Sequence, residues 1–116
     1  MPESNTTTVE VHPRVVVVSL TAERLDETNL PAVRAEVSAA GSASPDLPVA
    51  LDMSRVGFIP SFSLAGLIQL AQVFKARDQR LVLTGLQPAI RQVMTITRLD
   101  RLFEIRDDIA MLLGAK

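Results

Sequence analysis

The run of residues 15–20, Val-Val-Val-Val-Ser-Leu, is the sequence feature that most constrains how this chain can fold. Four consecutive β-branched residues favour a strand, and an apolar run without alternation is typical of a strand that is covered on both faces. Two more apolar runs of strand length, residues 49–53 and 80–85, follow at intervals that leave room for helices. Since parallel neighbours need a long crossover connection, this spacing predicts a mainly parallel sheet with helices between its strands.

The stretches between these strands show the apolar spacing of helices. In the first of them, Thr28 or Asn29 can cap a helix, Pro31 suits its first turn and Gly41 is placed to end it. In the third, the predicted inner face includes Ile96. The predicted helices cover residues 30–41, 64–78 and 88–97, with a weaker terminal helix over residues 109–113.

The two ends of the chain complete the predicted topology. Residues 1–8 are small and polar, which is typical of a flexible arm. Residues 9–12 alternate apolar and polar side chains before a turn, so they predict the outer strand of a leading β-hairpin, and residues 102–105 predict a last short strand. The predicted fold class is therefore α/β, as one domain over residues 9–116 with a mixed, mainly parallel sheet of four to five strands and three to four helices.

The charge balance excludes several classes of partner. The chain carries 12 Lys and Arg against 13 Asp and Glu, so it lacks the basic surface that binds nucleic acid or an anionic membrane. The longest apolar-rich stretch, residues 64–76, is too short to cross a bilayer, and no signal peptide is apparent. Because the sequence also has no cysteine, we expect a cytoplasmic protein that neither binds nucleic acid nor inserts into a membrane.

The sequence offers little material for catalysis. Its one histidine, His12, lies beside a turn and cannot form a metal site alone. There is no glycine-rich phosphate loop, and the carboxylates are isolated apart from the pair Asp107-Asp108. We therefore expect a protein without enzymatic activity, metal or other cofactor.

The segment of residues 58–67 is the candidate functional region. It passes from a strand to a helix at the expected carboxyl edge of the sheet, where α/β proteins usually place their binding surfaces. Ser61 and Ser63 are N-cap candidates, and the positive end of the helix would tolerate a phosphate there. Spacing alone favours simple capping over phosphorylation, and it leaves open whether Phe62 fills the core or is exposed as an anchor for a partner.

A wider pattern links this segment to the rest of the chain. Five segments follow one another: residues 23–26 (ERLD), 50–59 (ALDMSRVGFI), Ser61 with 64–67 (LAGL), 81–86 (LVLTGL) and 98–105 (RLDRLFEI). Together they resemble the STAS domain, the family of bacterial anti-sigma factor antagonists and of the cytoplasmic tails of sulfate transporters. The resemblance covers residues 9–114, and the order of the segments is more specific than any one of them.

The resemblance implies a binding surface and a regulatory site. In that family, the Leu-Asp pair after the second strand and the loop before the second helix meet an anti-sigma factor that is a serine kinase. By position, Asp26 matches the acidic contact and Ser61 the phosphoacceptor, with Ser63 as a second choice. The chain departs from the family pattern at Pro60, where an aspartate is expected, and at Phe62 and Ser63, where small residues and glycine are common. The implied partner-binding residues are Asp26, Pro60, Ser61, Phe62, Ser63 and Leu64.

Two roles follow from the resemblance. The first is an anti-sigma factor antagonist-like regulator that binds an anti-sigma factor of the serine kinase type and is switched by phosphorylation at Ser61. The second is a non-phosphorylated structural subunit of a lipid-transport ATPase or of a stressosome-type assembly, since Pro60 removes both a carboxylate and a backbone N–H. In either role we expect a monomer or a weak homodimer.

Overall fold

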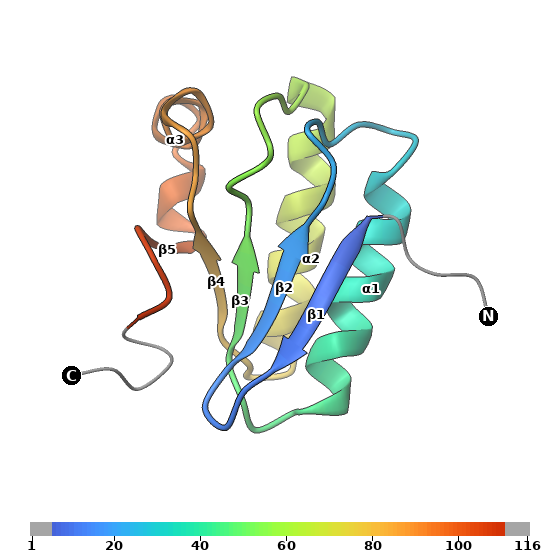
Figure 1. The fold of residues 1–116 in the computed structure, drawn as a ribbon. Helices are drawn as coiled ribbons and strands as arrows, with labels where there is room; N and C mark the ends of the chain where they lie inside the picture. The colour runs from blue at the N-terminus through green and yellow to red at the C-terminus, as the bar shows by residue number, and fades with distance from the viewer. Residues whose placement is uncertain (1–5, 111–116) are drawn as a thin grey trace.

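The computed structural model describes residues 6–110, in which five strands form one sheet and three α-helices lie along it (Figure 1). The strands are β1 (Thr7–Val11), β2 (Val16–Leu20), β3 (Val49–Asp52), β4 (Leu81–Thr84) and β5 (Glu104–Arg106). The helices are α1 (Leu30–Ala43), α2 (Leu64–Ala76) and α3 (Pro88–Ile96), with the 3₁₀ turns η1 (Ser61–Ser63) and η2 (Leu99–Arg101).

The sheet confirms the predicted α/β class. Its strand order is β1-β2-β3-β4-β5, so strands that are consecutive in sequence are neighbours in space. β1 runs antiparallel to β2 as the outer strand of the leading hairpin, and β2 to β5 run parallel to one another. A helix connects each parallel pair, so the carboxyl ends of β2, β3 and β4 meet at one edge of the sheet, which is uppermost in Figure 1.

The main core lies between the sheet and the helices. Leu51 points into it from β3, Phe74 from α2 and Met94 from α3. A second, smaller cluster lies on the other face of the sheet and contains Val15, Val17 and Ala50, with Ile109 packed against it. The predicted covering of both faces of the valine run is confirmed, since none of its four valines is more than 4% exposed.

The two ends of the described chain differ from the prediction. β1 begins at Thr7 rather than at Val9, so the last two residues of the predicted arm are paired with β2. Thr7 is buried opposite Leu20, a contact that its polar character does not reveal. At the other end, Ile109 and Ala110 lie in a bend and a turn rather than in a helix, and the rest of the predicted terminal helix lies outside the described residues.

Two helix predictions also need correction. α1 continues through Gly41 to Ala43. Gly41 is buried inside the helix, where the ring of Phe74 and the side chain of Gln79 approach its backbone too closely for a Cβ atom. On α3, Ile96 is 71% exposed rather than on the inner face, because it follows the buried Met94 by two residues and so lies on nearly the opposite side of the helix.

Candidate functional site at the carboxyl edge of the sheet

Two loops at the carboxyl edge of the sheet are joined to each other by their backbones. One follows β2 and the other follows β3. Arg24 and Phe58 form an isolated parallel bridge between them. The N–H of Leu25 donates to the carbonyl of Phe58 at 3.0 Å, and the N–H of Gly57 donates to the carbonyl of Glu23 at 2.7 Å. These bonds hold side by side the two segments that the sequence predicted to form one surface.

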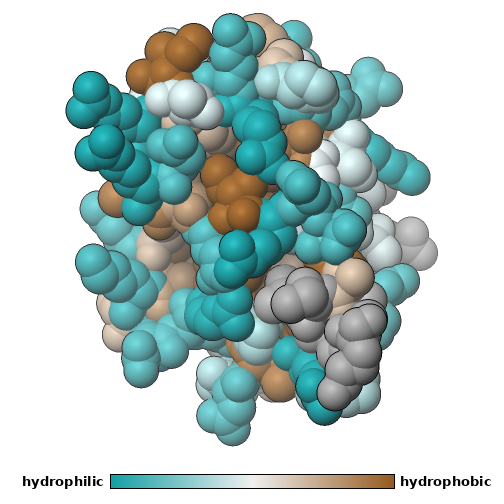
Figure 2. All heavy atoms as spheres, turned by 90° about the vertical axis from the view of Figure 1, so that its left-hand side faces the viewer, coloured by the Kyte–Doolittle hydropathy of each residue, from teal (hydrophilic) through white to brown (hydrophobic). Residues whose placement is uncertain are grey.

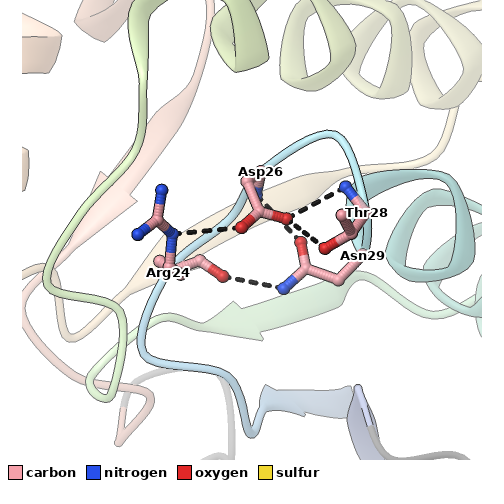
Figure 3. Close-up of polar contacts among 4 residues, drawn as sticks. All are labelled: Arg24, Asp26, Thr28 and Asn29. Atoms are coloured by element: carbon pink, nitrogen blue, oxygen red, sulfur yellow. Dashed lines mark hydrogen bonds and ion pairs between the residues drawn. The ribbon is translucent and has the colours of Figure 1, made fainter.

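Asp26 organises the loop between β2 and α1 (Figure 3). Its Oδ1 accepts hydrogen bonds from the N–H of Thr28 at 3.0 Å and from the Thr28 hydroxyl at 2.5 Å. Its Oδ2 lies 3.0 Å from Nε of Arg24. Asn29 stands at the cap position of α1, but its side chain accepts from the N–H of Asp26 and donates to the carbonyl of Arg24 instead of capping the helix. The loop is therefore held in one shape by its own polar groups.

These contacts lower the pKa of Asp26 below its ordinary value. The hydroxyl of Thr28 contributes most, followed by the N–H of Thr28, and the positive charge of Arg24 acts in the same direction. Partial burial opposes the shift. Asp26 is thus a carboxylate at neutral pH, and both of its oxygens already have partners within the chain.

The turn before α2 presents two residues to solvent. Pro60 has an extended conformation, with φ −59° and ψ 149°, and its carbonyl accepts from the N–H of Ser63 at 2.9 Å. The carbonyl of Ser61 accepts from the N–H of Leu64, so η1 leads directly into α2. Ser61 is exposed and Phe62 is 60% exposed. Of the two interpretations of Phe62, exposure is therefore the one that the structure supports.

Ser63 and Leu64 lie beneath this surface. Ser63 is 1% exposed, and its hydroxyl is buried without a hydrogen-bond partner in the described part of the chain. Leu64 is 7% exposed and belongs to the main core. Neither Ser61 nor Ser63 makes the predicted capping bond, because the 3₁₀ turn lets the backbone satisfy its own N–H groups. The predicted role of Ser63 and Leu64 as contact residues does not fit their burial; they support the turn from below.

Two hollows open at this edge. The first, of about 200 Å³, lies between the start of α1 and η1 and is called the Phe62 hollow below; it is lined by Glu27, Leu30, Pro31, Arg34, Phe62 and Ser63. The second, of about 440 Å³, lies among the loops that follow β2, β3 and β4; it is lined by Glu23, Arg24, Arg55, Gly57, Phe58 and Gln87. The carboxyl edge thus combines an exposed aromatic side chain with two concave surfaces.

Sequence reasoning missed Phe58 as a surface residue. Phe58 is 51% exposed, and the guanidinium carbon of Arg24 lies 5.0 Å from the centre of its ring. The sequence alone gives only a weak signal for this arrangement. Phe58 and Ile59 follow Gly57 beyond the end of β3, where no long strand ladder dictates which side chain points inward.

Residues 6–110 contain no cluster of three acidic or histidine side chains able to hold a metal ion. Within the same residues, no helix has both the length and the apolar character needed to cross a membrane.

Comparison with known proteins identifies the family of this chain. The model of the STAS domain matches residues 6–111. An anti-sigma factor antagonist from Mycobacterium paratuberculosis is 28% identical and superimposes with a TM-score of 0.77, over 98% of this chain and 95% of that one. An anti-sigma-factor antagonist (STAS) domain protein from Planctomyces limnophilus is 20% identical, with a TM-score of 0.79 over 97% of this chain and 98% of that one.

A third solved structure is the anti-sigma factor antagonist SpoIIAA of Bacillus in its unphosphorylated form. It is 20% identical to this chain and superimposes with a TM-score of 0.72, over 96% of this chain and 99% of that one. At this identity the likeness concerns the fold. The family match spans nearly the whole chain and agrees with the predicted resemblance, so this protein belongs to the STAS domain family.

Proposed function

We propose that this chain is a non-enzymatic, anti-sigma factor antagonist-like regulator that binds an anti-sigma factor of the serine kinase type in the cytoplasm. The observation that carries the proposal is the exposure of Ser61 and Phe62 together, on a turn at the carboxyl edge of the sheet. A phosphorylatable hydroxyl and a large apolar contact thus lie next to each other. A partner bound through Phe62 would also cover Ser61.

Phe62 supplies the main contact in this proposal. Large aromatic side chains beside a hollow are frequent energetic centres of protein interfaces. The Phe62 hollow adds Leu30 and Pro31 as apolar walls, with Glu27 and Arg34 as charged groups at the same opening. Asp26 contributes indirectly, since its bonds to Thr28 and Arg24 hold the adjacent loop in place.

Ser61 supplies the switch. It lies at the start of η1, which continues into α2, and no acidic residue lies in the first turn of either helix. The partial positive charge of a helix N-terminus therefore tolerates a phosphate on Ser61 within this chain. Phosphorylation adds about −1.5 to −2 charges. A partner that packs on the apolar ring of Phe62 would have to bury that charge. Phosphorylation of Ser61 therefore releases the partner.

The comparisons support this kind of regulation without identifying the partner. Several solved structures that share the fold are described as anti-sigma factor antagonists. For SpoIIAA of Bacillus, both an unphosphorylated and a phosphorylated form are known. Those forms belong to SpoIIAA; they bear on this chain through the family resemblance, which implies that Ser61 takes the position of the phosphoacceptor.

The test combines binding with phosphorylation. Purified anti-sigma factors of the serine kinase type from the same genome are titrated against wild type, Ser61→Ala and Ser61→Asp by calorimetry. Wild type and Ser61→Ala should bind one of them, and Ser61→Asp should bind it about tenfold or more weakly, as a charge buried in an apolar contact requires. Gln92→Glu, which adds a charge on exposed α3, is the control and should bind as wild type does.

With ATP and Mg²⁺, the same partner should add one phosphate to wild type and none to Ser61→Ala, as measured by intact mass. Equal affinity of wild type and Ser61→Asp would reject the switch. Failure of every such anti-sigma factor to bind wild type would reject the proposed function.

Pro60 favours a second candidate function. It stands where a carboxylate is expected in the family, and because proline has no backbone N–H, the loop before Ser61 has no donor at that position. The same surface would then serve a non-phosphorylated structural subunit of a lipid-transport ATPase or a stressosome-type assembly. Stable co-purification with such an assembly, together with an unmodified Ser61 in protein from its native host, would distinguish this role from the first.

A further inference from the structure

The two edges of the sheet differ in how they are protected. β5 has three residues, and its Glu104 is paired with Arg80 at 2.5 Å and with Arg106 at 2.9 Å. Figure 2, which views the molecule from the side of β5 and α3, shows hydrophilic side chains over most of that surface. Short strands and charged side chains are the usual means of preventing an edge strand from pairing with another chain. The β5 edge is therefore blocked.

β1 lacks this protection. It has five residues, Thr-Thr-Val-Glu-Val, with one charged side chain and no proline or lysine. Val9 is 46% exposed and Val11 is 65% exposed. Both lie opposite residues of β2 that face the main core, so their side chains project from the helix-bearing face of the sheet.

The register of the hairpin shows where the backbone groups of β1 point. The N–H of Thr21 donates to the carbonyl of Thr6 at 3.0 Å, and the N–H of His12 donates to the carbonyl of Val15 at 2.9 Å. In an antiparallel ladder, every second residue directs its N–H and C=O toward the same neighbour. Residues 6, 8, 10 and 12 therefore face β2, and Val9 and Val11 direct their backbone groups away from the sheet.

The side of α1 that lies next to β1 is lined by small residues. Glu36 marks that side, since its carboxylate accepts hydrogen bonds from the hydroxyls of Thr6 and Thr7. Residues three, four and seven positions after it share its helix face, and all three are alanine. They are Ala39, Ala40 and Ala43, of which Ala39 and Ala43 are exposed. Figure 1 shows β1 at the margin of the sheet with α1 beside it.

We propose that β1 pairs with β1 of a second copy of this chain, antiparallel and centred on Val9. In this register Val9 lies opposite Val9 of the second copy, and their outward N–H and C=O groups bond reciprocally. Glu10 lies opposite Thr8 of the second copy, so no like charges meet. A register centred on Glu10 would place two glutamates opposite each other, which is unfavourable.

The partner of the β1 edge is a second copy of this chain because the strand is complementary to itself about Val9. The two-fold axis makes both halves of the contact equal and closes the assembly at two chains. The valines of both strands then fill the space between two α1 helices, whose alanines permit the close approach of about 8–10 Å at which helices pack. The Ser61 turn lies at the carboxyl edge of the sheet and stays accessible, so this proposal does not depend on the proposed function.

The first test is the molar mass in solution. Sedimentation equilibrium of wild type should give a mass that rises from near the 12.6 kDa of one chain toward twice that value as concentration increases. The range from about 10 μM to about 1 mM covers the affinities of small interfaces. Val9→Lys places two like charges opposite each other and should raise the dissociation constant about tenfold or more. Ile96→Lys, the same change on exposed α3, is the control and should behave as wild type does.

The second test measures the register. The chain contains no cysteine, so Thr8→Cys and Glu10→Cys each introduce a single thiol. These positions face each other as a pair without mutual backbone bonds, where Cβ atoms are closest. An oxidised mixture of the two variants should form a disulfide-linked heterodimer, and neither variant alone should form a comparable amount of linked homodimer. A monomeric wild type at every concentration, a Val9→Lys dimer as tight as wild type, or linkage no greater in the mixture than in either variant alone would overturn the proposal.

Discussion

Phe62 is a large apolar side chain that the folded chain leaves 60% exposed, while Ser63 next to it is buried. A side chain in this position adds little to the stability of the fold, so its removal separates binding from folding. We expect Phe62→Ala to lower affinity for the partner about tenfold or more, the effect of losing an interface centre. The free energy of unfolding should change by no more than about 0.5 kcal/mol.

Calorimetric titration and urea unfolding measure the two effects of Phe62→Ala. Ile96→Ala removes another exposed apolar side chain, on α3, and serves as the matched control. It should leave both affinity and stability unchanged. A loss of stability in Phe62→Ala of several kcal/mol would contradict the exposed position of this ring.

Asp26 makes loop stability depend on pH. Because the folded chain lowers the pKa of Asp26 below its ordinary 3.8, chiefly through the Thr28 hydroxyl, the ionised form is favoured by folding. This contribution is fully present above the unfolded pKa and is lost as the pH falls through the folded pKa. Asp26→Asn should therefore melt at a lower temperature than wild type at pH 7, and the difference should shrink as the pH falls below 3.8.

Thermal unfolding of both proteins between pH 7 and pH 2 measures the effect of Asp26. Asp46→Asn, a change in the exposed loop between α1 and β3, is the control for general charge effects. A gap between wild type and Asp26→Asn that is the same at every pH would show that folding does not favour the ionised form of Asp26.

At the scale of elements, the packing of α1 against α2 depends on the absence of a side chain at Gly41. A Cβ atom there would lie 2.8 Å from the ring of Phe74 and 2.8 Å from Oε1 of Gln79. Gln79 also donates to the carbonyls of Gly41, Ser44 and Leu47, which joins the end of α1 to the next loop. Close packing around Gly41 therefore maintains both the contact between α1 and α2 and the hydrogen-bonded turn after α1.

Gly41→Ala tests this contact because helix propensity and packing act in opposite directions. Propensity favours alanine by about 1 kcal/mol in a helix interior. Overpacking of a buried site costs about 1–3 kcal/mol, and loss of the Gln79 bonds adds to that cost. We expect a net loss of about 1–2 kcal/mol in urea unfolding. Ala35→Gly, at an exposed position of α1, should lose about 1 kcal/mol through propensity alone, and stabilisation by Gly41→Ala would contradict the close approach.

At the scale of the whole molecule, stability is concentrated in the middle of the sheet. β2, β3 and β4 have neighbours on both sides and buried side chains on both faces, whereas β5 has one neighbouring strand and three partly or fully exposed residues. Opening a central strand therefore requires loss of most of the core. Opening β5 does not.

Amide hydrogen exchange should follow this arrangement. We expect the amides of Leu51 and Val82, which lie between β3 and β4, to exchange at rates set by global unfolding, and those of β5 to exchange faster through local opening. Exchange measured by NMR at neutral pH gives these rates residue by residue. Protection of β5 equal to that of β3 would mean that the edge opens only with the whole domain.

Much of the fold was predictable because its signals are local. The valine run predicted β2, and the apolar spacing after Leu64 predicted α2 and its buried face, since periodicity reflects which side of an element meets the core. Gly41 and Thr7 were misjudged because their places depend on Phe74, Gln79 and β2, which lie far away in the sequence. Local sequence patterns do not reveal contacts between residues that lie far apart in the sequence.

The sequence by itself determined the α/β topology, the order of the elements and the turn at residues 61–63 as the candidate site. Only the tertiary structure decided which residues of that turn face solvent, because a 3₁₀ turn at the end of a loop takes its orientation from the helices around it. It placed Ser61 and Phe62 outward and Ser63 and Leu64 inward. It also decided that Asp26 is bound to its own loop, because Arg24 and Thr28 reach its oxygens only once the loop has folded.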